Sequence, residues 1–401
     1  MMMNLREKIS NLSKQQYALI AVFLFIVICR FISAYVHKSL YVDEIDILNH
    51  IESLIATGCD ADSNRLPLFI IVGTGYGTFT YFYPLAILLK IVGFGALSAK
   101  FIQQILTIGA CLLVSFSMKK WVSEKNSEIM FWITLFVSLT IPWGFLQTNM
   151  IWDPAFVPIY FALHFFFFTQ LMKGENLTSF KRYLYAGLSF SLLVLLATVY
   201  PVCRIPAVVM WVFCLVWAYK ENKINYGQIA LIIFLSTIAA IPLAVNLLSP
   251  DFNQRATELF IFKGKSIRSE VHLFLENICS LISPGFLFVL GDHVIRHSLP
   301  VFGVLGTLSV IPLFSLRNEK LTPLFKYLIV IIATTILATA VTNENPHALR
   351  SCLCWMPFSI LLSFGWFNFL SDRAKKSQYK WYVVMALFFM AYFAAYVFFA
   401  G

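Results

Sequence analysis

Long apolar runs separated by short polar segments dominate the sequence. Runs of about 20 residues, which let a helix cross a hydrocarbon core of about 30 Å, recur from residue 17 to the C-terminus. The pattern predicts about eleven transmembrane helices, at residues 17–36, 98–118, 129–148, 154–172, 183–200, 204–219, 227–248, 300–316, 325–342, 351–370 and 381–400. Residues 1–401 are therefore predicted to form one all-α, polytopic membrane domain.

Composition agrees with a membrane location. Of the 401 residues, 59% are hydrophobic and only 12% are charged, which excludes an ordinary soluble globule with a polar shell. The eight cysteines lie mostly in apolar segments without a zinc-type spacing, so most are expected to be packing residues. Cys59 and Cys279 fall in two long polar segments and are a candidate disulfide pair.

The net charge of +10 comes from basic clusters in short loops, which indicates membrane orientation rather than nucleic-acid binding. These clusters lie at residues 119–125, 173–182, 220–223, 317–326 and 373–380, and the positive-inside rule places them in the cytoplasm. The run 17–36 follows a basic arm and lacks a small-x-small cleavage site, so it is predicted to be an uncleaved anchor with a cytoplasmic N-terminus. The protein is therefore expected in the inner or plasma membrane.

The remaining polar segments then emerge together on the outer face, at residues 37–97, 149–153, 200–204, 249–299 and 343–350. Residues 37–97 form the first outer loop and residues 249–299 the second large one. Within the first loop, the apolar stretch 79–95 is short and interrupted by Pro84 and Lys90. Counting it as a span would reverse every later loop, so we predict an interfacial or re-entrant helix there.

The first outer loop opens with adjacent acids, Asp43 and Glu44, in the stretch "SLYVDEIDILNH". Apolar positions over residues 44–57 recur near the helical period, and Gly58 follows, which predicts a short amphipathic helix on the membrane surface. Asp43 at its start is either a helix N-cap or a functional carboxylate, and its companions must decide between them.

Those companions occur in the other outer segments. They are Asp153 before Pro154, Tyr200 and Arg204 around Pro201, Arg255, the group Asp292, Arg296 and His297, and the pair His347 and Arg350. If the loops converge over the bundle, carboxylates, guanidiniums and imidazoles share one cavity at the outer leaflet. Considered singly, each arginine could contact lipid headgroups, each histidine could be an ordinary hydrogen-bonding residue, and Asp153 could cap the next helix.

Taken together, this mixture suits transfer of a sugar from a lipid phosphate. A carboxylate takes the proton of the acceptor, and cations hold the charge that grows on the departing phosphate. Arginine suits the second task because its planar fork meets phosphate oxygens in pairs and stays protonated. Asp43 is then the candidate base. Arg204, Arg255, Arg296, His297 and Arg350 are candidate phosphate ligands, and Tyr200, Asp292 and His347 are candidate pocket residues.

The motifs "DE" after the first span, "TFTYFYPL" leading to "FG", "SPGFLFVLGDHVIRHS" and "NPHALRS" together resemble the GT-C superfamily. The resemblance is to membrane glycosyltransferases of the protein-mannosyltransferase and aminoarabinose-transferase type and runs over residues 15–365. It implies that Asp43 is the catalytic base, that Glu44 supports it, and that Asp153 is the second outer acid. It also implies juxtamembrane helices in the first outer loop and a polyprenyl-phosphate sugar donor. Some members of the superfamily need a divalent cation, for which Asp43 and Asp153 are candidate ligands.

The expected function is transfer of a single sugar from a polyprenyl-phosphate donor to a hydroxyl of a glycan, lipid or protein acceptor on the outer face, with inversion. No W-W-D run of the oligosaccharyltransferase type is present, which disfavours transfer of a whole oligosaccharide. The alternatives are a polysaccharide polymerase or ligase, and a transporter or flippase of a lipid-linked sugar. A transporter would carry ionisable residues near the bilayer midplane and two corresponding halves.

Overall fold

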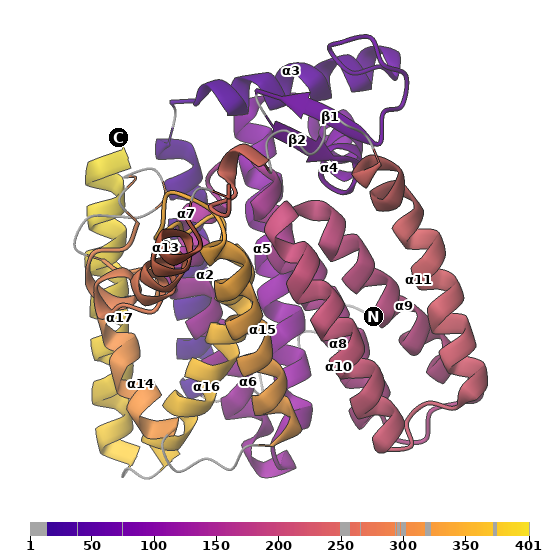
Figure 1. The fold of residues 1–401 in the computed structure, drawn as a ribbon. Coiled ribbons are helices and arrows are strands. Elements are labelled where there is room, and N and C mark those ends of the chain that lie inside the picture. Colours follow the sequence, from indigo (N-terminus) through magenta and orange to yellow (C-terminus); the bar gives the residue numbers. More distant parts are fainter. Residues whose placement is uncertain are drawn as a thin grey trace.

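The protein is a bundle of long helices with a cap of shorter elements across one end (Figure 1). In Figure 1 the helix α3 lies over that end, beside the strands β1 and β2 and the helix α4. This computed structural model describes residues 14–37, 39–73, 75–248, 257–264, 266–292, 294, 297, 302–316, 322–371 and 375–400.

Ten helical stretches in the described ranges are long and apolar enough to cross a membrane. Nine of them coincide with predicted spans, so an all-α, polytopic membrane fold is confirmed. The helices of these nine are α2 (Lys14–Val36), α5 (Ala96–Met118), α8 (Val157–Lys173), α9 (Ser179–Val199), α10 (Arg204–Lys220), α11 (Tyr226–Leu247), α15 (Pro323–Ala340), α16 (Trp355–Ser371) and α17 (Lys375–Ala400). At the centre, α8 packs against α9 and α5, while α10 packs against α15.

Two predicted spans differ from the structure. Residues 129–148 form two helices, α6 (Ser127–Thr140) and α7 (Pro142–Gln147), because Pro142 lacks an N–H and favours an extended residue before it. Ile141 accordingly has φ −60° and ψ 128°. Of the predicted span 300–316, the described part contains a 3₁₀ turn (Thr307–Ser309) and the short helix α14 (Val310–Ser315).

The tenth candidate span, Ile267–Val289, lies in the segment predicted to be the second large outer loop. It combines the helix α13 (Ile267–Leu281) with a π-helical turn at Gly285–Val289. The helix carries Arg268, Glu270 and Glu276 and runs across the long helices rather than along them (Figure 1). The apolar positions of α13 thus belong to an amphipathic helix that the sequence analysis did not predict.

The first outer loop contains the predicted amphipathic helix, α3 (Val42–Thr57). The buried face of this helix carries Ile47, Leu48, Ile51 and Leu54. The helix ends at Gly58, which adopts the left-handed region with φ 75°. A β-hairpin, which the sequence analysis did not predict, follows: β1 (Phe69–Val72) pairs antiparallel with β2 (Gly75–Thr78). The next helix, α4 (Phe79–Val92), packs on α3 and is about 21 Å long, which is shorter than a hydrocarbon core of about 30 Å.

A buried arginine holds the break between α6 and α7. Arg30 of α2 is fully buried, and its guanidinium donates to the carbonyl oxygens of Leu139 (2.8 Å) and Gly144 (3.1 Å). It also donates to Gln104 Oε1 (2.9 Å) and Thr148 Oγ1 (2.8 Å). One side chain thus satisfies backbone groups on both sides of the break.

The cysteines largely follow the sequence analysis, since Cys29, Cys111, Cys203, Cys214, Cys352 and Cys354 are buried. Cys59 and Cys279 are both free thiols, so the candidate disulfide between them is not formed.

Candidate active site

A cavity of about 410 Å³ opens at the capped end of the bundle. Its walls come from α3, the β-hairpin, the start of α4, residues 152–153, residues 200–205, residues 259–260 and residues 338–350. Six of the residues singled out from the sequence line it: Asp43, Asp153, Tyr200, Arg204, His347 and Arg350. Segments far apart along the chain therefore meet in one pocket.

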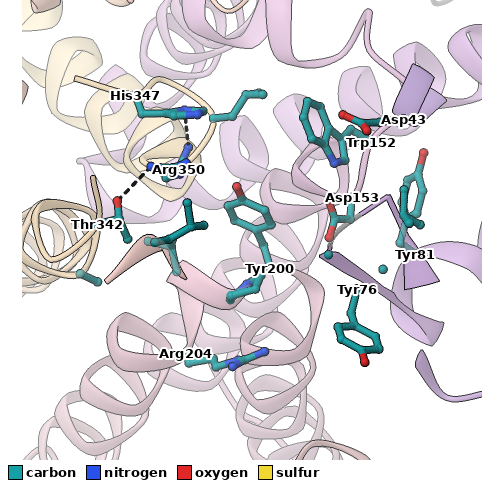
Figure 2. A pocket seen from close by; sticks show the side chains of 18 of the residues that line it. Asp43, Tyr76, Tyr81, Trp152, Asp153, Tyr200, Arg204, Thr342, His347 and Arg350 are labelled. Atoms are coloured by element: carbon teal, nitrogen blue, oxygen red, sulfur yellow. Dashed lines mark hydrogen bonds between the residues drawn. The ribbon is translucent and has the colours of Figure 1, made fainter. Parts of the chain in front are cut away.

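Figure 2 shows how the charged groups are distributed around this cavity. The Asp43 and Asp153 carboxylates lie on one side, with Trp152 between them, and His347 and Arg350 lie on the opposite side. The Tyr200 ring stands between the two groups. The cavity thus has an acidic wall and a basic wall.

Asp43 lies in the first turn of α3 and is half-buried. The β-hairpin turn comes close to it, because a Cβ added at Gly73 would stand 3.4 Å from Asp43 Oδ1. Gly73 has φ +55° and its N–H donates to Asp46 Oδ2 (2.9 Å), so Asp46 fixes the turn against α3. Asp43 does not occupy the N-cap position of the helix, which belongs to Tyr41. The backbone N–H of Tyr41 donates to Glu44 Oε2.

Glu44 does not line the cavity but ties its acidic wall together. The side chain is fully buried, and Oε2 accepts from Tyr41 N (3.0 Å) while Oε1 accepts from Ile151 N (2.8 Å), 107 residues further along the chain. Lys100 Nζ lies 3.9 Å from Oε1 and donates to the His37 carbonyl (2.7 Å). The predicted supporting role thus has a geometric basis, because Glu44 joins the start of α3 to the segment that carries Asp153.

Two glutamines of α5 hold the same segment. Gln103 Nε2 donates to Met150 O (2.7 Å), and Gln104 Nε2 donates to Asn149 Oδ1 (2.7 Å). Gln103 Oε1 also accepts from the hydroxyl of Tyr81, which lines the cavity. Residues 148–150 are therefore bound to α5 just before the chain enters the cavity wall.

Asp153 begins a 3₁₀ turn (Asp153–Phe156) that leads into α8, and 5% of its surface is exposed. The N-cap position of the turn is Trp152 rather than Asp153. Burial raises the pKa of the Tyr200 phenol, and the negative charge of Asp153 raises it further. Tyr200 therefore remains a protonated hydrogen-bond donor beside this carboxylate.

Arg350 forms the core of the basic wall and is 6% exposed. Its guanidinium donates to Thr342 Oγ1 (3.2 Å), to the Asn343 carbonyl and to Glu344 Oε2 (3.0 Å). The Glu344 side chain is 70% exposed, so this ion pair is partly screened by solvent. The backbone N–H of Arg350 also donates to His347 Nδ1 at 3.4 Å (Figure 2).

Asp292 and His297 lie behind the basic wall rather than on the cavity surface. Asp292 Oδ2 accepts from Ala348 N (2.7 Å) and pairs with His297 Nδ1 (3.1 Å). Burial acts to raise the pKa of Asp292, but hydrogen bonds from His297, Val294 N and Ala348 N outweigh it and lower that pKa. Asp292 thus anchors the 347–350 segment. Arg255 and Arg296 lie outside the described residues.

Three aromatic lining residues, Tyr76, Tyr81 and Trp152, were not assigned from the sequence. Their only sequence signal is their position at a membrane edge, which interfacial aromatic belts share. In the described part of the chain, groups of three metal-ligating side chains occur at Asp292, His297 and His347 and at His50, Asp60 and Asp62. Asp43 and Asp153 belong to neither group. That these two acids share a divalent cation stays a prediction.

The sequence matches no family model and no curated protein, but solved membrane enzymes share its fold. ArnT from Cupriavidus metallidurans bound to undecaprenyl phosphate superposes with a TM-score of 0.59 at 11% identity, covering 94% of this chain and 64% of ArnT. The archaeal oligosaccharyltransferase AglB from Archaeoglobus fulgidus, in complex with an inhibitory peptide and a dolichol-phosphate, superposes with a TM-score of 0.53 at 12% identity.

The chain therefore shares the fold of these two membrane enzymes. The resemblance noted in the sequence is confirmed at the level of the fold. The chain spans less than two thirds of either match, since the superposition covers 64% of ArnT and 56% of AglB.

Replacing Glu44 with Ala is expected to destabilise the protein by about 3–5 kcal/mol, because the Lys100 charge and the Ile151 N–H would remain buried without their partner. Thermal unfolding of the purified protein in detergent measures the loss. Glu52→Ala, on the exposed face of the same helix, is the matched control and should change stability by less than about 0.5 kcal/mol. Equal melting temperatures for the two variants would contradict the proposed tie.

Proposed function

We propose that this protein is a membrane glycosyltransferase that moves a single sugar from a polyprenyl-phosphate donor to an acceptor hydroxyl. The observation that supports this most is the opposed arrangement of carboxylates and cations around one cavity in a GT-C fold. The names of the matched structures add support for the donor, because ArnT was solved with undecaprenyl phosphate and AglB with a dolichol-phosphate.

The proposed reaction uses the two walls for different tasks. Asp43 takes the proton of the acceptor hydroxyl, and the acceptor oxygen forms a bond to the anomeric carbon of the sugar. The bond from that carbon to the phosphate oxygen breaks, and its electron pair leaves with the polyprenyl phosphate. Attack from the acidic wall with departure toward the basic wall inverts the anomeric carbon.

The remaining lining residues support this displacement. Arg204, His347 and Arg350 hold the negative charge that grows on the departing phosphate, and cations that are fixed in advance stabilise it best. Asp153 acts as a second carboxylate beside the acceptor, and the protonated Tyr200 hydroxyl donates between the two walls. A glycan, lipid or protein hydroxyl could serve as the acceptor.

We further propose that the cavity faces the non-cytoplasmic side of the inner or plasma membrane. The distribution of lysines supports this orientation, because Lys119, Lys173, Lys181 and Lys220 lie at the end of the helices away from the cavity.

Replacing Asp43 with Asn is expected to lower the transfer rate by roughly 10²–10⁴-fold, because the amide cannot accept the proton. Mass spectrometry of cell-surface glycans and glycolipids, in cells carrying either form, should show one sugar missing in the variant. Asp62→Asn, at an exposed position of the same loop, is the matched control. Normal turnover in a membrane-inserted Asp43→Asn protein would rule out the base, and unchanged glycans in cells that lack the protein would count against sugar transfer.

Replacing Arg204 or Arg350 with Gln is expected to weaken binding of polyprenyl phosphate by roughly 10- to 100-fold, through loss of a charge-assisted hydrogen bond. Titration of the purified protein with the lipid phosphate measures this affinity. The matched control is Arg182→Gln, an exposed arginine at the opposite end of the bundle. Because Arg350 also binds Thr342 and Glu344, thermal unfolding must show that its variant is folded. Unchanged affinity in both folded variants would exclude Arg204 and Arg350 as ligands of the phosphate.

Cysteines introduced at Asp62 and Ser123 should label from opposite sides of the membrane, because the two residues lie at opposite ends of the bundle. The background variant replaces Cys59 and Cys279 with Ser. A membrane-impermeant maleimide added to intact cells is expected to label Asp62→Cys alone, and both positions after permeabilisation. Labelling of Ser123→Cys in intact cells would reverse the proposed orientation.

A further inference from the structure

The cluster behind the basic wall has the composition of a metal site. Asp292, His297 and His347 each offer one ligand atom, and these atoms all lie within 4.8 Å of one another. Two imidazoles with one carboxylate are a common ligand set for divalent zinc and related metals. The side chains of Asp292 and His297 are 2% and 1% exposed, whereas that of His347 is 13% exposed and reaches the cavity.

The distances within the cluster suit a shared cation. Asp292 Oδ2 lies 3.1 Å from His297 Nδ1 and 3.8 Å from His347 Nδ1. Ligands at about 2.0–2.1 Å from a tetrahedral zinc stand roughly 3.3 Å apart, which falls between these two separations. The two imidazole rings stack face to face, with centroids 4.6 Å apart and planes 29° apart.

Hydrogen bonds already tie the cluster to the segment that carries His347. Asp292 Oδ2 accepts from Ala348 N and pairs with His297 Nδ1. His347 Nδ1 accepts from the backbone N–H of Arg350 at 3.4 Å and lies 3.8 Å from Asp292 Oδ2. A cation held by His347 Nδ1 would take the place of this long contact with the Arg350 N–H, because the ring nitrogen has a single lone pair.

The second cluster, His50, Asp60 and Asp62, is a weaker candidate because Asp62 is exposed and no member lines the cavity. His50 Nδ1 accepts from Ala61 N (3.1 Å). The two carboxylate oxygens of Asp60 accept from the N–H (2.8 Å) and the side-chain amide (3.0 Å) of Asn64. These contacts stabilise the polar turn that follows α3.

We propose that Asp292, His297 and His347 form a divalent-cation site of the zinc class at the edge of the cavity. Three protein ligands leave a fourth position open, and His347 directs that position toward the space beside Arg350. If the proposed function holds, an oxygen of the donor phosphate occupies the fourth position. The cation would then add positive charge to the basic wall, where Glu344 partly offsets that of Arg350.

The test uses the full-length protein in detergent with metal ions alone. After exposure to Zn²⁺ and dialysis, elemental analysis should find about one zinc per chain, as a single ligand set requires. Co²⁺ should give the visible absorption of a tetrahedral site, and Zn²⁺ should abolish it. The affinity for the metal should fall at least about tenfold in each of the variants His297→Gln, Asp292→Asn and His347→Gln. His272→Gln, an exposed histidine on α13, is the matched control and should retain it.

Absence of stoichiometric zinc and of the Co²⁺ spectrum in the wild-type protein would overturn the proposal. So would full retention of metal in the three ligand variants, which would point to another cluster. His347 is the least buried ligand, so its variant serves if the other two do not fold. Sugar transfer by a protein that binds no metal would contradict the metal site but not the proposed function. Metal binding by a protein that transfers no sugar would contradict the proposed function but not the metal site.

Discussion

A peptide group inside a membrane must find its hydrogen-bond partner within the protein, and this constraint governs the candidate site. The helical pattern breaks at Ile141, resumes in the short helix α7, and gives way to irregular backbone at residues 148–152, just before Asp153. Arg30 binds the carbonyls on both sides of the break, and the glutamines of α5 bind the next turn. Because these partners are buried side chains of other helices, the irregular segment is held in one place, and it delivers Trp152 and Asp153 to the cavity wall.

The same logic links the first outer loop to the bundle. Glu44 joins the N-terminus of α3 to Ile151, and Asp46 joins the middle of α3 to the hairpin turn at Gly73. Asp43, which directly precedes Glu44 in sequence, lines the cavity beside these two fixed acids. Three acids within four positions therefore have three different tasks, two in holding backbone groups and one toward the cavity.

The sequence predicted most of the membrane helices because hydropathy over about 20 residues reflects a cost that every spanning helix must meet. It failed where an apolar run is not one straight helix. Pro142 indicates the break in residues 129–148, but the residues on both sides of it are apolar, so the segment was predicted as one span. The helix α13 mixes charged and apolar residues, so its segment was predicted as a loop. The hairpin was missed because its short strands contain glycines and few alternating positions.

The same limit applies to the site. Membership of the cavity was predictable for Asp43, Asp153, Arg204 and Arg350, since each lies at the outer end of a predicted span or in an outer loop. The hydrogen-bond partners of Glu44 could not be predicted from the sequence. Its bond to Ile151 joins residues 107 positions apart and depends on how the chain packs. Arg30 gave a usable signal that went unused, since a lone charge within an apolar span is retained only where the bundle provides partners.

The location of the polar groups also bears on the choice between transfer and transport. A transporter needs a site that opens in turn to both sides, with walls that move against each other. Here the cavity lies at one end of the bundle, and its acidic wall is tied to α2 and α5 through buried hydrogen bonds of Arg30, Gln103 and Glu44. The buried guanidinium of Arg30 binds backbone carbonyls and does not line a pathway between the two sides. A rigid, one-sided pocket with opposed charges suits a reaction that needs fixed positions for a nucleophile and a leaving group more than it suits alternating access.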